Sequence, residues 1–344
     1  MAKVTIDDVA HLAGVSIKTV SRVVNQEPNV RESTRVKVET AITRLNYRPN
    51  LSARNLASHR SHLIALVYDD PGIYDTPSAG YVIRLQQGAL RACQNADCEL
   101  LIHPCNYREP EVRSELMRVL ERSRPDGVVI AAPLSNMKQI FGAAADAKVP
   151  YVRLSPGVRS SGEFCVGTDD RAISARMTEH LASLGHKRIG FISGHTKHRA
   201  VANRLRGYQD GLAKAGLKFQ ERWVAQGDNS IRSGEAAGAK LMERKVPPTA
   251  IFAANDDMAA GVVRYASRAG IAIPGQLSVA GFDDSALAQH IYPALTTVRQ
   301  PLAAMADRAV TSLLARAREG EPQPGLEVIP GELKLRESTG SAPS

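Results

Sequence analysis

The chain has 344 residues, which is enough for two or three domains of ordinary size. Hydrophobic residues make up 43% and charged residues 23%, and no apolar run approaches the roughly 18 residues of a membrane span, so an integral membrane protein is excluded. Residues 1–11 contain Asp7 and Asp8 and have no apolar stretch of the kind a secretory signal needs. We therefore expect a cytoplasmic protein without such a signal. The four cysteines form no C-x-x-C pair, which favours buried thiols over a disulfide framework or a zinc site.

The net charge of +9 is concentrated at the start of the chain. Residues 1–62 carry ten Lys or Arg against five Asp or Glu, so +5 lies in this segment and +4 in the other 282 residues. A small basic segment ahead of a nearly balanced body is typical of a nucleic-acid-binding module attached to a regulatory or catalytic body. On charge alone, a basic end that only aids solubility is the alternative.

Two short helices are predicted at the N-terminal end. Thr5 is the expected N-cap of the first helix, with Asp8 three residues on. Gly14 can adopt the positive φ of a tight turn, and Ser16 then caps the second helix. The apolar positions that repeat at helical spacing are Ile6, Val9, Ala10, Ala13, Val20, Val23 and Val24. Two helices at a three-residue turn have the spacing of a helix-turn-helix.

The outer face of the second helix carries polar and basic side chains that could meet base edges and phosphates in a DNA major groove. These side chains, together with one apolar neighbour, are Ile17, Lys18, Thr19, Ser21 and Arg22. An N-terminal αα-hairpin of an enzyme is the alternative interpretation.

A third helix is predicted over residues 32–45, with Asn46 in the left-handed position that ends it. The residues expected to close a small core are Val36, Thr40, Ile42 and Leu45. Pro49 then prevents backward extension of the next helical stretch, residues 50–57, which is too short to be stable alone. This stretch is therefore expected to need a partner in order to fold.

These motifs carry a family resemblance. The patterns D-V-A-x-x-A-G-V-S-x-x-T-V-S-R-V-V-N and Y-R-P-N-x-x-A-R-x-L resemble the DNA-binding head and hinge of the LacI/GalR family of bacterial transcription regulators. The resemblance continues through A-A-N-D-D-M-A-A-G, L-S-V-A-G-F-D-D and the ending L-R-E-S-T. The DNA-binding residues that helix geometry and the resemblance together predict are Thr5, Ser16, Ile17, Lys18, Thr19, Ser21, Arg22, Asn25, Asn50, Ala53 and Leu56.

From residue 62 onward, short apolar runs alternate with longer amphipathic ones. The strand candidates are residues 62–67, 99–103, 127–131, 151–154, 188–193, 250–253, 277–281 and 296–299. The helix candidates include residues 82–94, 111–121, 172–184, 201–215 and 258–269. This alternation predicts an α/β core of two doubly wound lobes with parallel sheets, behind an all-α head.

The resemblance implies a periplasmic-binding-protein-like core and a specific domain organisation. The expected parts are a helix-turn-helix domain over residues 1–48, a hinge over 49–61, and an effector-binding and dimerisation core over 62–344. Lobe one of that core is expected over about 62–168 and 298–328, and lobe two over about 169–297 and 329–344. The lobes are therefore joined by three crossovers.

Polar residues follow several predicted strands, at the edge where such folds bind ligands. They are Asp69, Asp70, Tyr81, His195, His198, Asn255, Asp256, Asp283 and Asp284, with Arg204 early in a helix. Carboxylates, an amide and one guanidinium can offer paired donors and acceptors to the vicinal hydroxyls of a polyol. The alternative for each residue is an N-cap or a salt bridge, and for Asp256 and Asp284 we favour the N-cap.

The resemblance matches Arg204, Asn255 and Asp283 to effector contacts, and Tyr81 to an aromatic pocket position. Asn229 stands where some relatives place an aromatic ring, and His198 stands where purine-binding relatives place arginine. A sugar or glycoside is therefore expected rather than a flat purine. The predicted effector-binding set is Tyr81, His198, Arg204, Asn229, Asn255 and Asp283.

Enzyme motifs are absent from the sequence. It contains no G-x-S-x-G, P-loop, G-x-G-x-x-G after a strand, or H-E-x-x-H. His195-x-x-His198 has no third metal ligand in sequence, so neither a metal nor another cofactor is predicted. A sugar-handling enzyme with a DNA-binding head is the remote alternative, and turnover of a bound sugar would reveal it.

The sequence thus predicts a homodimeric, ligand-responsive transcription factor, in this family most often a repressor. Its two heads are expected to bind the half-sites of a near-palindromic operator, because a two-fold protein reads two-fold DNA. A purine or nucleoside effector and a co-repressor response are the alternatives. The final residues contain no apolar heptads, so a coiled-coil tetramer is not expected.

Overall fold

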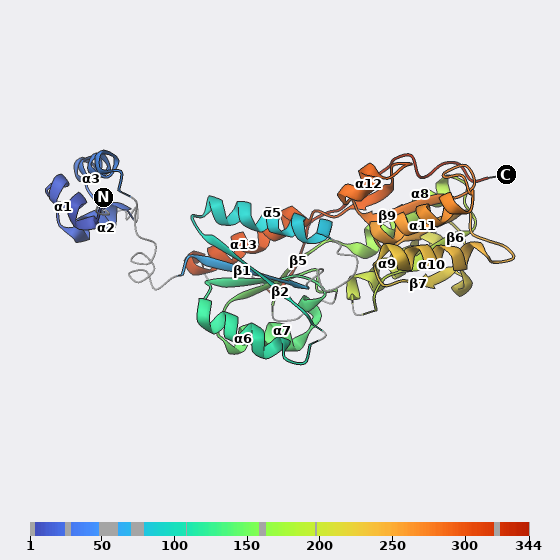
Figure 1. Cartoon of the computed structure of the whole chain (residues 1–344), viewed down its shortest axis with the longest axis horizontal. Coiled ribbons are helices and arrows are strands. Elements are labelled where there is room, and N and C mark those ends of the chain that lie inside the picture. The colour runs from blue at the N-terminus through green and yellow to red at the C-terminus, as the bar shows by residue number, and fades with distance from the viewer. Residues whose placement is uncertain are drawn as a thin grey trace. The chain divides into compact units, whose positions relative to one another are not determined.

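The computed structural model divides into two compact units, residues 1–61 and residues 62–344 (Figure 1). The residues that it describes are 4–24, 29–47, 61–69, 79–107, 109–157, 163–196, 198–319 and 324–343. Within these residues, no helix is long and apolar enough to cross a membrane.

The N-terminal unit, the head, is helical. Its helices are α1 (Ile6–Ala13), α2 (Ile17–Val24) and α3 (Glu32–Leu45). The backbone N–H and the hydroxyl of Thr5 both donate to Asp8, each at 2.8 Å, so the predicted capping pair is confirmed. Gly14 has φ 66°, which lets the chain turn sharply into α2. Ser16 Oγ accepts the Thr19 N–H at 3.2 Å, and Asn46 is left-handed at φ 49°, both as predicted.

The core of the head corrects one sequence expectation. The fully packed side chains are Val9, Ala10, Val20, Val23, Val38 and Ala41. On α3 the buried positions are Val38 and Ala41, whereas Val36 is 52% exposed and Thr40 is exposed. The prediction that Val36 and Thr40 close the core is therefore wrong, because the phase of α3 against α1 and α2 selects positions 38 and 41. Ile42 and Leu45 pack partly against this core, as expected.

Lobe one is built on a sheet of parallel strands in the order β11-β5-β4-β3-β1-β2. Its strands are β1 (Leu63–Asp69), β2 (Glu99–Cys105), β3 (Gly127–Ile130), β4 (Tyr151–Leu154), β5 (Phe164–Gly167) and β11 (Gly325–Val328). Its helices are α5 (Ala79–Asn95), α6 (Val112–Ser123), η2 (Leu134–Asn136), α7 (Lys138–Asp146) and α13 (Leu302–Glu319).

The sheet of lobe one is covered on both faces, with α5 and α13 on one side and α6 and α7 on the other (Figure 1). Successive residues of β1 point to opposite faces of the sheet: Ile64 and Leu66 pack toward α5 and α13, while Ala65 and Val67 pack toward α6. A strand buried on both faces needs the continuous apolar run that made β1 predictable.

Lobe two repeats this architecture with strand order β12-β10-β9-β8-β6-β7, in which only the β10–β12 pair is antiparallel. Its strands are β6 (Ile189–Ser193), β7 (Val224–Gln226), β8 (Ala250–Ala253), β9 (Ser278–Asp283), β10 (Thr296–Arg299) and β12 (Glu332–Lys334). Its helices are α8 (Asp170–Ser183), α9 (Arg199–Lys214), η3 (Glu221–Trp223), α10 (Ile231–Met242), α11 (Asp256–Arg268) and α12 (Ala286–His290).

The chain passes between the lobes three times within the described residues: from β5 to α8, from β10 to α13, and from β11 to β12. The predicted fold class, a helical head with two doubly wound α/β lobes, is confirmed. The sequence did not predict β5, β7, β11 and β12. Of these, β7, β11 and β12 are edge strands that carry polar residues or lack a continuous apolar run, unlike the central strands.

Candidate DNA interface and effector site

The head presents the predicted outer face of α2 to solvent. Ile17 is 47% exposed although it is apolar, and Lys18 and Arg22 are exposed on the same short helix. Thr19 and Ser21 are half-buried beside them, while Val20 and Val23 point into the core. An exposed isoleucine flanked by basic side chains on a helix-turn-helix has the chemistry of contact with a thymine methyl, base edges and phosphates.

The remaining DNA-binding predictions divide into two groups. Thr5 and Ser16 are exposed caps of α1 and α2, at the helix N-termini where backbone N–H groups attract phosphate. The predicted contacts that lie outside the described residues are Asn25, Asn50, Ala53 and Leu56.

In the core, polar side chains gather at the carboxyl ends of neighbouring strands of lobe two. Asp283 ends β9, Asn255 follows β8, and Asn229 follows β7. Arg204 lies on α9, whose N-cap is His198. Lobe one contributes Tyr81 near the start of α5. The tertiary structure thus brings most of the predicted effector set to one edge of the lobe-two sheet.

Arg204 is the positive centre of this group, and it is only 7% exposed. Its Nε donates to Asp170 at 2.9 Å, and one terminal nitrogen donates to the Ala254 carbonyl at 2.5 Å. Its guanidinium carbon lies 3.6 Å from the centroid of the Phe282 ring. The guanidinium is therefore fixed in orientation by a buried carboxylate, a carbonyl and an aromatic face.

Asp283 lies beside Arg204 with an incomplete set of partners. Its Oδ1 is 3.9 Å from the Arg204 guanidinium and accepts a hydrogen bond from the Gln300 amide. The side chain is 13% exposed. Burial raises the pKa of Asp283 to about 7, although Arg204 and Gln300 oppose that rise. Its φ of 122° is a strained left-handed value, of the kind that clusters at functional sites.

Asn255 and Asn229 are linked to each other and to the backbone. Asn255 Oδ1 caps α11 by accepting the Met258 N–H at 3.0 Å, and its Nδ2 donates to the Asn229 carbonyl at 2.9 Å. Asn229 Oδ1 in turn accepts the His195 N–H at 3.3 Å. The Asn255 side chain is therefore the N-cap of α11, which was the alternative interpretation of this residue. Ligand contact by Asn255 and Asn229 stays a prediction.

Tyr81, on α5, is the residue that lobe one contributes to this group of polar side chains. Its hydroxyl is buried and makes no hydrogen bond of ordinary geometry with the described residues, although the Ala132 backbone lies near. Burial raises the pKa of Tyr81, and the negative charge of Asp283 adds to the rise. On the lobe-two side, burial lowers the pKa of His198 to about 4, with His195 and Arg204 acting in the same direction, so His198 is neutral.

The predicted capping roles of Asp256 and Asp284 are wrong. Asp256, 1% exposed, accepts the Ser285 backbone N–H at 2.7 Å and a hydrogen bond from the Thr297 hydroxyl, while Asn255 is the cap of α11. Asp284 is fully buried between Arg299 and Arg336, which come from β10 and from the segment after β12. Asp256 ties the start of α11 to Ser285 and β10, and Asp284 ties the end of β9 to β10 and the segment after β12. Sequence spacing does not reveal these links.

Sequence reasoning missed two residues that hold the site in place, Asp170 and Gln300. Asp170, the partner of Arg204, is 6% exposed and follows β5 in the run V-G-T-D-D. Gln300 follows β10 directly and holds Asp283. Each of these residues comes just after a strand, so the rule that selected Asp283 would also have found Asp170 if the four-residue β5 had been recognised.

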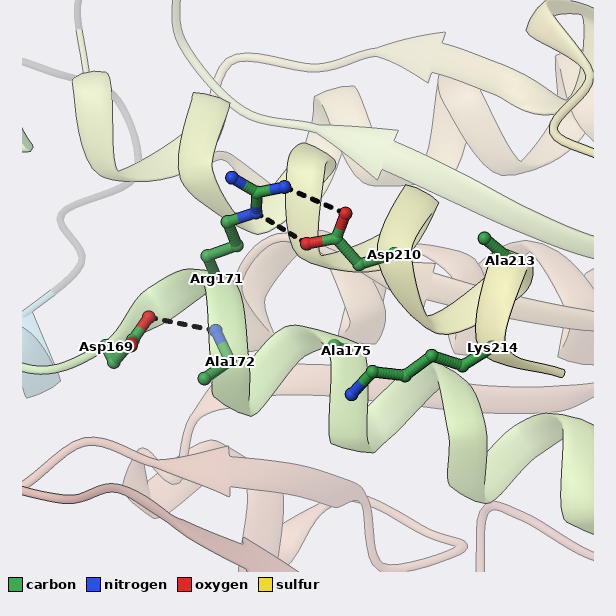
Figure 2. Close-up of a pocket in the computed structure, with 7 residues that line it drawn as sticks. All are labelled: Asp169, Arg171, Ala172, Ala175, Asp210, Ala213 and Lys214. Atoms are coloured by element: carbon green, nitrogen blue, oxygen red, sulfur yellow. Dashed lines mark hydrogen bonds and ion pairs between the residues drawn. The ribbon is translucent and has the colours of Figure 1, made fainter.

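The groove drawn in Figure 2 lies elsewhere on lobe two. It is open, measures about 450 Å³ and is lined by Asp169, Arg171, Ala172, Ala175, Asp210, Ala213 and Lys214 of α8, α9 and the residue before α8. Arg171 forms a two-pronged ion pair with Asp210, and Lys214 pairs with Glu179 at 2.9 Å. Because its main charges are satisfied by one another at the surface, this groove is not a candidate ligand site.

Comparisons with known proteins agree with the geometry of both units. Residues 5–50 match the model of the bacterial regulatory proteins of the lacI family, and residues 178–339 match a periplasmic binding protein-like domain. The transcriptional regulator GalR of Escherichia coli K12 is 33% identical over 347 residues, covering 99% of this chain and 96% of GalR. The chain belongs to the LacI family.

Two solved structures extend this likeness over nearly the whole chain. A complex of the transcriptional regulator CelR with cellobiose is 30% identical with a TM-score of 0.74, covering 98% of this chain and 100% of CelR. The lac repressor dimer bound to operator and the anti-inducer ONPF is 27% identical with a TM-score of 0.78, at the same coverage. This LacI-family chain is a DNA-binding transcription regulator and not an enzyme.

Proposed function

We propose that this regulator is a homodimeric repressor of a sugar-utilisation operon, acting in the cytoplasm, and that a sugar or glycoside bound between its lobes controls operator binding. One observation carries the effector site. Asp283 and Arg204 of lobe two converge on Tyr81 of lobe one, whose buried hydroxyl has no hydrogen-bond partner of ordinary geometry in the described structure. A buried polar group without a partner is costly, so a ligand that bonds to it is favoured.

The chemistry of these groups suits hydroxyls. Asp283 offers a carboxylate acceptor and Arg204 a fixed guanidinium donor, which together match neighbouring hydroxyls of a sugar ring. The neutral His198 offers no positive charge, and Asn229 offers no aromatic face, where a purine would need them. The similarity to GalR and to a CelR structure that holds cellobiose supports the same effector class.

The DNA-binding half of the proposal rests on the exposed face of α2, in particular Ile17, Lys18 and Arg22. Two heads would place two such helices in successive major grooves of a near-palindromic operator. Leu56 is proposed as an apolar wedge in the minor groove at the operator centre, with Ala53 allowing the paired hinge helices to approach. The similar lac repressor was solved as a dimer on its operator.

Exposed apolar side chains on the core support dimerisation. Ile83 and Leu90 on α5 are 47% and 46% exposed, and Tyr292, just after α12, is 87% exposed. Large apolar side chains left in water on a regulator core are typical of surfaces that a second subunit covers. Sedimentation of the full chain should therefore give a dimer, and Tyr292→Asp should shift it toward monomer.

The decisive experiment combines a thermal-shift screen of the full chain with an operator-release assay. Sugars and glycosides form one panel, and guanine, hypoxanthine and nucleosides form the other. A sugar at about 100 times its Kd should stabilise the protein by about 2.7 kcal/mol. The same sugar should release the chain from its operator. Arg22→Ala is the matched control, because it should weaken operator binding and keep the thermal shift.

The outcomes separate the alternatives. A shift with a nucleobase and with no sugar would replace the sugar by a purine effector. A sugar that tightens operator binding instead of releasing it would make the ligand a co-repressor. A sugar that is chemically altered during incubation would restore the enzyme alternative.

A further inference from the structure

The tertiary structure brings two of the four cysteines together where α5 ends and β2 begins. Cys93 lies in the last turn of α5, and Cys98 directly precedes β2; both are thiols in this structure. Cys93 is 0% exposed and belongs to the core beneath α5, and the half-buried Cys98 packs against the same core. The two side chains therefore point toward one cluster of buried residues.

The turn between α5 and β2 holds these two residues close together. The Cys98 backbone N–H donates to the Cys93 carbonyl at 2.9 Å, and the Asp97 N–H donates to the Gln94 carbonyl at 3.3 Å. Asp97 is left-handed at φ 54°. These features define a Schellman motif, in which the side chains at the positions of Cys93 and Cys98 characteristically pack against each other.

The 2.9 Å hydrogen bond also sets an upper limit on the distance between the two Cα atoms. Within a residue, Cα lies about 2.4 Å from the carbonyl oxygen and about 1.5 Å from the nitrogen. The Cα atoms of Cys93 and Cys98 are therefore at most about 6.8 Å apart. Disulfides bridge Cα separations of about 4.4 to 6.8 Å, so the backbone of this turn lies within the range that a disulfide can span.

We propose that Cys93 and Cys98 are a redox modification site, at which hydrogen peroxide closes the two thiols to an intramolecular disulfide. This site lies in lobe one and is independent of the sugar effector. The closed form links the end of α5 covalently to the residue before β2. Opening of this turn is then blocked, whereas the reduced form holds it with backbone hydrogen bonds.

The reaction proceeds in two balanced steps. The Cys98 thiolate attacks one oxygen of the peroxide, and the O–O bond breaks to give a Cys98 sulfenic acid and, after protonation, water. The Cys93 sulfur then attacks the Cys98 sulfur, forms the S–S bond and displaces hydroxide, which leaves as water with the Cys93 proton. The two thiols lose two electrons and two protons in total, and one peroxide becomes two waters.

Exposure decides which thiol reacts first. Burial raises the pKa of Cys93 to about 12, and the nearby Cys98 and Glu99 add to that rise, so Cys93 is a poor nucleophile toward a solute. Cys98 is partly open to solvent and takes the first step. Cys93 takes the second step because the turn holds it beside the sulfenic acid. A small thiol reverses the bond by exchange.

The test treats the full chain with a small molar excess of hydrogen peroxide, blocks the remaining thiols under denaturing conditions, and maps them by mass spectrometry. Cleavage with trypsin and Asp-N separates Cys93 from Cys98, because Asp-N cuts before Asp97. Two of the four thiols should be lost, the fragments that carry Cys93 and Cys98 should be joined, and dithiothreitol should restore both thiols. Amide exchange at residues 96–98 should slow by at least about tenfold in the oxidised chain.

Cysteine variants assign the bond. Cys105→Ala and Cys165→Ala, at cysteines that are each 1% exposed, are the matched controls and should form the disulfide as the wild type does. Because Cys98 and Cys105 lie on one fragment, Cys105→Ala also decides which of them is joined to Cys93. Cys98→Ser should form no intramolecular disulfide. Cys93→Ala, which keeps the accessible thiol, should leave a sulfenic acid on Cys98 that dimedone labels.

Several results would overturn the redox site. One is that all four thiols survive a peroxide treatment that consumes free cysteine in the same solution. Another is a disulfide that joins two chains through Cys98. A third is a sulfinic acid on Cys98 beside an intact Cys93 thiol, since it would show that Cys93 does not reach the sulfenic acid. A disulfide that leaves amide exchange at residues 96–98 unchanged would refute the blocked turn.

Discussion

Replacing Asp283 by asparagine should stabilise lobe two at alkaline pH and abolish the ligand response. The carboxyl is 13% exposed and faces one guanidinium at 3.9 Å, while Asp170 takes the closer position at 2.9 Å. Burial raises the pKa of Asp283 from its ordinary value of 3.8 to about 7. Its charged form is therefore less stable in the folded protein than in the unfolded chain.

The size and sign of the effect follow from this pKa. Well below pH 3.8 the carboxyl is protonated in both states and contributes no pH dependence. Between pH 4 and 7 the folded protein retains a proton that the unfolded chain has lost, so stability falls as the pH rises. Above pH 7 the accumulated cost reaches about 4 kcal/mol, at 1.36 kcal/mol per pH unit. Asp283→Asn removes this cost, since an amide carries no charge.

The assay is urea unfolding of the full chain from pH 5 to 8.5, followed by tryptophan fluorescence. Trp223 is the only tryptophan in the sequence and is 5% exposed in lobe two, so its signal reports this lobe separately from the head. The stability of Asp283→Asn relative to the wild type should increase by a few kcal/mol between pH 5 and 8. Loss of the sugar response should accompany it, because the acceptor for the ligand hydroxyl is weakened.

Asp284→Asn is the matched control, since it changes the neighbouring residue with the opposite electrostatics. Burial alone would raise the pKa of Asp284, but hydrogen bonds from Arg336 and Arg299 hold it below its usual value. Its contribution to stability is present above pH 4 and is lost in acid, so Asp284→Asn should destabilise lobe two most at neutral pH. If Asp283→Asn destabilised the protein at pH 8 as Asp284→Asn does, Asp283 would be a structural ion-pair partner, and the reasoning would be refuted.

Three further predictions concern other parts of the molecule. Arg22→Ala should weaken operator binding by roughly 1 to 3 kcal/mol and relax one base position in each half-site, and unchanged base preference in a binding-site selection would contradict this. Gly261→Ala would place a Cβ 2.1 Å from the Ile231 carbonyl oxygen, so the packing of α10 on α11 should be destabilised by at least about 1 to 3 kcal/mol in the same urea assay. Gly216→Ala is its control: no atom lies within 4 Å of the added Cβ, but φ is 70°, so this variant measures the cost of backbone strain alone. His186→Leu should cost about 1 to 3 kcal/mol in that assay, because it leaves Thr249 and Ser278 without their imidazole partner, and a neutral result would mean that water replaces the ring.

The order of helices and strands along the chain could be predicted because caps, turns and buried strands each depend on residues that are close in sequence. The Thr5–Asp8 cap, the Gly14 turn and the Asn46 helix end each depend on residues within a few positions of one another, and all are confirmed. Strands buried on both faces, such as β1 and β8, appear in the sequence as continuous apolar runs. The polar residues that follow these strands could be assigned to one sheet edge without knowledge of the tertiary fold.

Partnerships between distant residues were decided only by the tertiary structure. Asp170 and Arg204 are 34 positions apart, Asp284 and Arg336 are 52 apart, and Tyr107 meets His195 across two lobes. The order of strands in each sheet determines which loops become neighbours, and three chain crossings determine how the lobes face each other. Spacing along the sequence fixes which face of an element a side chain occupies, whereas the partner it finds there depends on long-range packing. For that reason the sequence determined that this protein has a DNA-binding head and a two-lobed core, and the tertiary structure decided which side chains gather at its proposed effector site.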